Sequence, residues 1–230
     1  MNVTIVYPSC AHSAYQIAAR EFASLAGKVS GASTKIITDL DFPGDHGNAE
    51  LVVLIGNDSV NSVTADFYLK KKIAGFGIRY GTDDYCIRSA DLEGKKYLFL
   101  VGGRPRSSLY AVYRYFELFC GCRWFWDGDR IPDSQLPHAD IDIVESPRFD
   151  YRGLRYFAHR SLHRFQAEHW SFEDWAAEID WMVKKRLNLF MLRIGMDDLF
   201  QKAFPDVVPY PNRDEKLPEA GAGYDDRTLF

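Results

Sequence analysis

The sequence lacks any apolar run that approaches the roughly 20 residues a helix needs to cross a bilayer. It also lacks a recognisable leader, because Asn2–Tyr7 (NVTIVY) has the pattern of a strand almost from the first residue. As written, the sequence therefore predicts a cytoplasmic protein with no membrane partner.

An excess of basic charge is also missing. The chain has 28 Lys and Arg against 32 Asp and Glu, which gives a formal net charge of −4. Surfaces that bind nucleic acid are strongly basic, so we expect no nucleic acid partner.

Cysteine is scarce, with four residues in 230. A chain of this length with four scattered cysteines is not a disulfide scaffold. Cys120 and Cys122 are too close together for a zinc knuckle, and no second Cys/His pair stands at ligand spacing. We therefore expect Cys10, Cys86, Cys120 and Cys122 to be buried free thiols, and we expect no metal site.

What is present is typical of an α/β protein, with 47% hydrophobic and 15% aromatic residues. Apolar periodicity predicts helices over about Ala11–Ala26 and around Leu109–Phe119, the second ended by Gly121. The predicted strands are Val3–Tyr7, Lys35–Leu40, Leu51–Ile55, a hairpin of Ile87 with Tyr97–Val101, Arg123–Trp126 and the edge strand Ile141–Val144.

A second region begins near Ser146-Pro147. We expect a strand over Tyr151–Phe157, then a helix capped by Ser171, then an apolar strand over Leu189–Ile194. A helix that leads directly into such a strand indicates a βαβ unit. The inward stripe of this helix is predicted to consist of Phe172, Trp175, Ala176, Ile179, Met182, Val183 and the stem of Arg186.

Several motifs resemble known enzymes. Gly102–Tyr113 (GGRPRSSLYAVY) followed by Gly121–Trp126 (GCRWFW) resembles the domain that precedes the catalytic barrel in exo-acting glycoside hydrolases. These include the α-glucuronidases of family 67, the β-N-acetylhexosaminidases of family 20 and the α-N-acetylglucosaminidases of family 89. Pro147–Phe149 with Arg152–Leu154 resembles the first barrel strand of the hexosaminidases. Glu178–Met182 with Asn188-Leu189 is similar to the following helix and strand of the α-N-acetylglucosaminidases.

The resemblance, which extends from about Asp83 to Pro211, implies a fold and a reaction. Residues 1–146 would form a mixed-sheet α/β domain, and residues 147–230 would be the first strand-helix-strand units of a (β/α)₈ barrel that is apparently truncated, since such a barrel needs about 250 residues. The implied activity is hydrolysis of terminal sugars of a glycan, so the expected partner is carbohydrate, with no organic cofactor. In these families the catalytic carboxylates follow later barrel strands, so the catalytic residues are unknown here and this fragment is expected to be inactive.

Arg152 is the first candidate for substrate binding. The matching arginine of the hexosaminidases bonds hydroxyls of the terminal sugar, and a fork of donors suits a vicinal diol. The alternative is a strand arginine that pairs with a carboxylate at the domain interface.

Asp198 is the second candidate, just past the second barrel strand, at the end where barrel sites form. Neighbouring Asp197 fits better as the cap of a short helix. Phe190–Arg193 departs from the His-rich stretch that the hexosaminidases carry on this strand.

His159 is the third candidate, in a loop with His163 and His169. The loop could contact sugar, hold a metal or simply be solvated, and no carboxylate or Cys completes a metal site. Trp170, Trp175 and Trp181 could stack on a sugar ring, although Trp175 falls on the predicted buried stripe.

Gly102-Gly103 before a helix superficially suggests a phosphate cradle, but the Walker Lys-Ser/Thr and the GxGxxG spacing are both absent. A turn and helix start fits better. Two other functions stay open: a non-catalytic carbohydrate-binding or interaction module on the same scaffold, and a nucleotide-binding α/β protein.

Overall fold

The computed structural model describes residues 1–10, 12–44, 47–70, 72–92, 94–154 and 170–190. The chain divides into two compact units, residues 1–154 with 170–189 and residues 155–169 with 190–230. All described residues except Phe190 belong to the first unit. Among these residues, no helix has the length and apolar character that a bilayer span requires.

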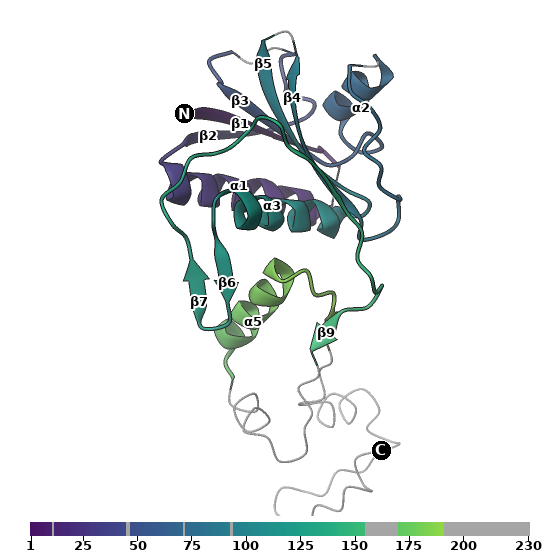
Figure 1. The fold of residues 1–230 in the computed structure, drawn as a ribbon. Helices are drawn as coiled ribbons and strands as arrows, with labels where there is room; N and C mark the ends of the chain where they lie inside the picture. The colour runs from purple at the N-terminus through teal and green to yellow at the C-terminus, as the bar shows by residue number, and fades with distance from the viewer. Residues whose placement is uncertain (11, 45–46, 71, 93, 155–169, 191–230) are drawn as a thin grey trace, which may run out of the picture. The chain divides into compact units, whose positions relative to one another are not determined.

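Six strands form one mixed sheet in the order β2-β1-β3-β5-β4-β8 (Figure 1). Strands β2, β1, β3 and β5 are parallel, whereas β4 runs antiparallel to both β5 and β8. The strands are β1 (Asn2–Tyr7), β2 (Ser33–Thr38), β3 (Leu51–Ile55), β4 (Tyr85–Leu92), β5 (Lys95–Gly102) and β8 (Asp142–Glu145). The predicted mixed sheet, its hairpin and its edge strand are confirmed.

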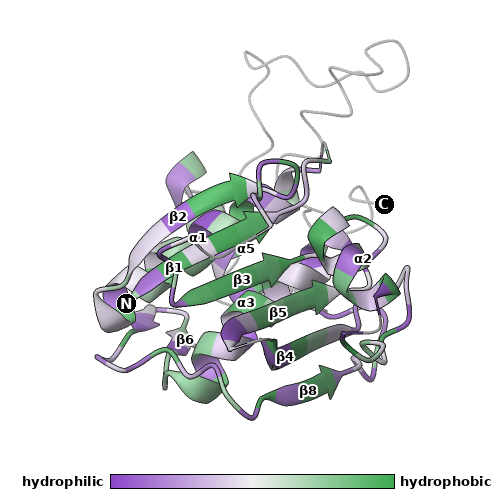
Figure 2. Cartoon of the chain, turned by 90° about the horizontal axis from the view of Figure 1, so that it is seen from above, coloured by the Kyte–Doolittle hydropathy of each residue, from purple (hydrophilic) through white to green (hydrophobic). Residues whose placement is uncertain are grey.

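Helices cover both faces of this sheet. α1 (Ser13–Ser30) and α3 (Pro105–Phe119) lie on one face, and the shorter α2 (Ser62–Leu69) lies on the other (Figure 1). Because successive side chains alternate across a strand, Val53 faces α1 and α3 while its neighbours Val52 and Leu54 join the core with Phe67 of α2. The central strands are accordingly apolar along most of their length, as Figure 2 shows.

The ends of α1 and α3 follow local sequence signals. The His12 side chain accepts the N–H of Ala14 at the start of α1, and Gly31 at its end has φ 66°. The α3 helix ends at the cap residue Cys120, and Gly121 follows with φ 74°. Gly121 thus ends the helix as the sequence predicts, one position after the cap.

A second group of elements adjoins α3. The hairpin β6 (Arg123–Phe125) and β7 (Gly128–Arg130) is followed by β9 (Gly153–Leu154), α5 (Phe172–Lys184) and β10 (Leu189–Phe190). Strand β9 pairs with β10, and α5 packs against α3 and β6. Ser171 caps α5 through a reciprocal capping box with Asp174, so the predicted helix start is confirmed.

The predicted inward stripe of α5 is partly wrong. Phe172 is 81% and Ile179 47% exposed, whereas Met182 and Glu178 are each 4% exposed. The face that packs against α3 and β6 is thus rotated toward Glu178, whose carboxylate accepts a hydrogen bond of 2.6 Å from Trp126 Nε1. Burial raises the pKa of Glu178, and the Trp126 N–H partly offsets that shift.

The prediction of four buried thiols holds for three of them. Cys86, Cys120 and Cys122 are buried and free, whereas Cys10 is free but exposed. The prediction is wrong for Cys10 because this residue lies in the exposed connection between β1 and α1.

Candidate functional site

Of the three predicted substrate-binding residues, only Arg152 lies among the described residues. Asp198 and His159 lie outside them, as do Asp197, His163 and His169. The geometry of a candidate site can therefore be built around Arg152 alone.

The Arg152 side chain is 16% exposed and is held by groups of the chain itself. Its Nε donates to the carbonyl of Arg186 at 2.8 Å, and Nη1 donates to the carbonyls of Phe149 at 2.8 Å and Asp150 at 3.4 Å. Its Nη2 forms an ion pair of 2.8 Å with Asp83 Oδ2. The carboxylate pairing considered as the alternative for Arg152 is thus present.

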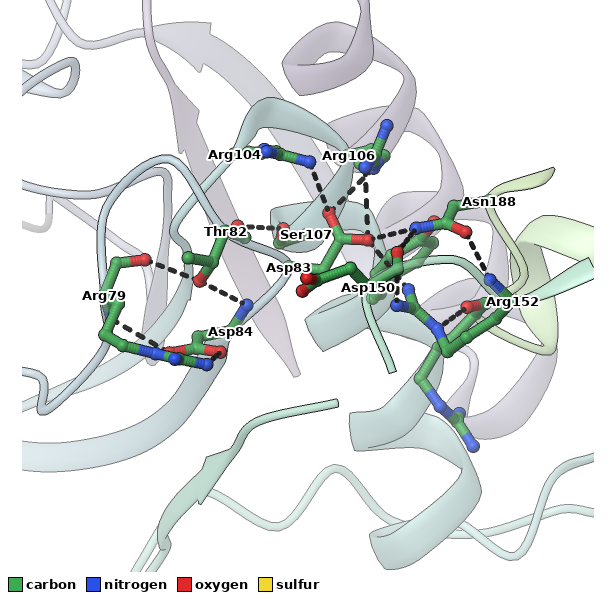
Figure 3. A network of polar contacts seen from close by, with 12 residues as sticks. Arg79, Thr82, Asp83, Asp84, Arg104, Arg106, Ser107, Asp150, Arg152 and Asn188 are labelled. Carbon is green, nitrogen blue, oxygen red and sulfur yellow. Dashed lines mark hydrogen bonds and ion pairs between the residues drawn. The ribbon is translucent and has the colours of Figure 1, made fainter. Parts of the chain in front are cut away.

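Asp83 is a functional candidate that the sequence analysis missed. Its carboxylate is buried and lies at the centre of a polar cluster (Figure 3). Oδ1 accepts Arg106 Nε at 2.8 Å, while Oδ2 accepts Arg106 Nη2 at 3.2 Å and Asn188 Nδ2 at 2.7 Å, besides Arg152. We call Asp83, Arg106, Arg152 and Asn188 the Asp83 network.

The charge of Asp83 is stabilised despite its burial. Burial alone would raise the pKa of this carboxyl, but Arg106, Arg152 and Asn188 together hold it below its ordinary value. Asp83 is therefore an anion that requires its donors, and removing any one of them leaves a buried charge less well compensated.

Asn188 uses both ends of its amide in this network. Its Oδ1 accepts the backbone N–H of Arg152 at 2.8 Å, and its Nδ2 donates to the carbonyl of Asp150 at 2.7 Å as well as to Asp83. The backbone N–H of Asn188 in turn donates to the carbonyl of Arg152 at 2.8 Å. Asn188, the residue before β10, is thus hydrogen-bonded through its side chain and its backbone to Arg152, the residue before β9.

The neighbouring Asp84 fixes the loop that carries Asp83. Its Oδ2 accepts Arg79 Nε at 2.9 Å, and its Oδ1 accepts Arg79 Nη2 at 3.1 Å. The Arg79 hydrogen bonds lower the pKa of Asp84 to about 2, against the opposing effect of burial. The N–H of Gly103 donates to the carbonyl of Asp84 at 2.8 Å, which ties this loop to the end of β5.

This pKa predicts an acid-sensitive contribution to stability. Because the pKa of Asp84 is lower in the folded chain than its ordinary value of about 4, its charge stabilises the fold above that value. The contribution is lost as the pH falls through about 2. The difference in unfolding free energy between wild type and Asp84→Asn should therefore shrink by roughly 2 kcal/mol from pH 5 to pH 2.

Urea denaturation at a series of pH values measures this difference. The control is Asp91→Asn, since Asp91 pairs with Lys96 at the surface and should change the profile far less. A difference between wild type and Asp84→Asn that is independent of pH would contradict the assignment.

Gly102 and Gly103 are explained by close backbone contact. A Cβ on Gly102 would lie 2.3 Å from the backbone nitrogen of Ser108, and one on Gly103 would lie 2.3 Å from the carbonyl oxygen of Arg79. Arg106, which follows these glycines in the sequence, is hydrogen-bonded to Asp83. These glycines let α3 and the Asp83 loop approach the sheet, which supports the turn interpretation over a phosphate cradle.

A second polar cluster lies along α3. Arg114 bonds Glu145 Oε1 through Nε at 3.0 Å and Nη2 at 2.8 Å, and its Nη1 lies 2.9 Å from Glu117 Oε2. Arg186, which follows α5, donates to the same Glu117 oxygen at 3.0 Å. Glu117 thus links α3 to the segment between α5 and β10.

A carboxylate of the chain itself binds N–H groups near the point of the sheet at which α/β proteins bind nucleotides. In such sheets the ligand lies where the strand order reverses, here beyond the ends of β1 and β3. Asp39 accepts the N–H groups of Ser9 at 2.7 Å and Ser62, the first residue of α2, at 2.8 Å. Burial opposes the charge of Asp39, but these N–H groups keep its pKa lowered. The carboxylate thus takes the position of an anionic ligand, which argues against the nucleotide-binding hypothesis.

Comparison with known proteins gives partial matches. No protein-family model matches the chain. Over 96 residues the chain is 28% identical to the Homo sapiens alpha-N-acetylglucosaminidase, a match that covers 41% of this chain and 12% of the human protein. The chain therefore spans a small part of that relative.

Two solved structures are also similar. A family GH115 4-O-methyl-alpha-glucuronidase with specificity for decorated arabinogalactans aligns with a TM-score of 0.55 at 12% identity, over 81% of this chain and 24% of its own. A Streptomyces plicatus beta-hexosaminidase mutant in complex with GlcNAc aligns with a TM-score of 0.37 at 13% identity, over 65% of this chain and 23% of its own. The resemblance to glycoside hydrolases stated from the sequence is confirmed, with the solved glucuronidase in family GH115 rather than 67.

Proposed function

We propose that this chain is the N-terminal portion of a glycoside hydrolase that acts on the terminal sugars of a glycan. Residues 1–146 are the α/β domain that precedes the catalytic domain, and residues 147–230 begin a (β/α)₈ barrel that the chain does not complete. The observation that carries the proposal is the strand-helix-strand unit of β9, α5 and β10. It lies where the sequence resembles these enzymes, and its two strands pair with each other.

The catalytic and sugar-binding roles that we propose follow from the chemistry of the reaction. A general acid protonates the leaving oxygen while negative charge supports the oxocarbenium-like transition state. We assign these carboxylates to later barrel strands, so the 230-residue chain by itself is expected to be inactive. Arg152, Asp198 and His159 are proposed to contact the sugar in the complete site.

The geometry of Arg152 restricts how it would contact a sugar. Bonds within the chain use its Nε–H, both N–H groups of Nη1 and one N–H of Nη2. The guanidinium also hydrogen-bonds Tyr110 and lies 5.9 Å from the centroid of its ring. Arg152 therefore has at most one donor left for a sugar hydroxyl rather than a free fork.

The coding sequence beyond Phe230 is one test. Further βα units with Asp or Glu at strand ends are expected, whereas a natural stop codon at this point would favour the non-catalytic carbohydrate-binding module. Calorimetry separates the third hypothesis. The chain is expected to release no binding heat with ATP or NAD, and micromolar binding of either would contradict the proposal.

A further inference from the structure

The Asp83 network connects two parts of the chain that the sequence separates widely. Asp83 lies 23 residues from Arg106, 69 from Arg152 and 105 from Asn188. Arg106 belongs to α3, whereas Arg152 and Asn188 directly precede β9 and β10. The carboxylate therefore lies between the α/β domain and the strand pair (Figure 3).

Arg106 determines the direction in which the carboxylate points. Its Nε and Nη2 approach both oxygens of Asp83, at 2.8 Å and 3.2 Å, in a fork geometry that fixes the plane of the carboxylate. In this orientation Oδ2 is presented to Arg152 and Asn188 together, at 2.8 Å and 2.7 Å.

We propose that Asp83 is the positioning residue for Arg152, because it orients the Arg152 guanidinium and, through Asn188, fixes the pairing of β9 with β10. The substrate contact of Arg152 belongs to the proposed function, whereas the positioning rests on the contacts alone. A residue of the α/β domain thereby shapes the sugar-binding region of the barrel, and this gives the domain a role in specificity.

The chemistry of the network requires a carboxylate at position 83. Both oxygens of Asp83 face donors, namely the guanidinium of Arg106 on one side and the N–H groups of Arg152 and Asn188 on the other. An asparagine at this position would turn its NH₂ group toward one of these donors and leave it unpaired. Asp83→Asn should therefore release the strand pair although it barely changes the shape of the side chain.

Hydrogen exchange of the 230-residue chain tests the proposal. In Asp83→Asn, peptides that cover 150–154 and 186–190 should exchange about tenfold faster or more, while peptides of β1 and β3 keep their wild-type rates. The NMR signal of the Arg152 Nε–H, which donates to the carbonyl of Arg186, should lose its protection as well.

Asp39→Asn is the matched control. Asp39 is also a buried aspartate, but its carboxylate accepts the N–H groups of Ser9 and Ser62 and has no part in the Asp83 network. This variant should leave the Arg152 Nε–H and the 186–190 peptides as in wild type. Equal effects of the two substitutions, or wild-type exchange in Asp83→Asn, would overturn the proposal.

Asn188→Ser is a second variant that tests the proposal if Asp83→Asn fails to fold. Ser removes the amide that joins Asp83 to the strand pair and leaves the α/β domain intact, so peptides 150–154 should exchange faster. Unchanged exchange there would also overturn the proposal. No sugar is present in these measurements, so a protein without glycosidase activity would refute the proposed function without altering their outcome.

Discussion

Replacing Gly103 by alanine is expected to lower the free energy of unfolding by about 3 kcal/mol, a large effect for one added methyl group. The new Cβ would lie 2.3 Å from the carbonyl oxygen of Arg79 and 2.8 Å from that of Thr82. Both atoms are backbone and cannot swing aside as a side chain would. Gly103 also accepts the N–H of Gly81 and donates to Asp84, so the whole loop would have to shift.

Gly27→Ala provides the same substitution in open space. Gly27 lies inside α1 and is exposed, and a methyl group added there would meet no neighbouring atom within 4 Å. Because alanine is the better helix former, this variant should be more stable than wild type by about 1 kcal/mol. Urea denaturation of both variants gives the comparison. Similar stabilities for the two would refute the close-contact explanation and, with it, the reason given for how the Asp83 loop is held.

Asn61→Ala is expected to cost a similar amount, about 3 kcal/mol, as the sum of a lost helix cap and an unsatisfied buried carbonyl. Asn61 is fully buried. Its Oδ1 accepts the N–H groups of Val63 and Thr64 at the start of α2, at 3.0 Å and 3.1 Å. Its Nδ2 donates to the carbonyl of Ile55 at the end of β3, at 2.9 Å.

Two further variants separate the cost of the lost helix cap from that of the unsatisfied carbonyl. Asn61→Ser retains a capping acceptor for α2 and buries no charge but is too short to keep the amide donor to β3, so it should fall between wild type and Asn61→Ala. His12→Ala removes the exposed cap of α1 and should cost about 1 kcal/mol. Urea denaturation of wild type and of these variants measures the differences in unfolding free energy. If Asn61→Ala cost no more than His12→Ala, Asn61 would be an ordinary cap rather than a link between β3 and α2.

Elements with strong local signals were predictable from the sequence. The limits predicted for β3 agree with the structure, because five successive apolar residues fit a strand covered on both faces. The predicted hairpin turns at Gly94, between β4 and β5, where the glycine has φ 76°. Helix α2 was not predicted, because its eight residues have no clear apolar stripe, and its position depends on Asn61 and Asp39 rather than on periodicity.

The candidate site was only partly predictable. Arg152 could be chosen because a family resemblance pointed to it, and its pairing with some carboxylate was foreseen as an alternative. Asp83 could not be identified as that partner, because local patterns do not reveal contacts across 69 or 105 residues. For the same reason the packed face of α5 was misjudged, since the partner of the buried Glu178 is Trp126, 52 residues away.

The most direct test of the proposed function is an assay of glycoside hydrolysis. The protein that includes the coding sequence beyond Phe230 would be incubated with 4-nitrophenyl α-glucuronide and with the α- and β-N-acetylglucosaminides, alongside the 230-residue chain. We expect the longer protein to release 4-nitrophenol from at least one of these substrates and the 230-residue chain to release none. A folded longer protein that cleaves neither these substrates nor a glycan with terminal sugars would contradict the assignment to the glycoside hydrolases.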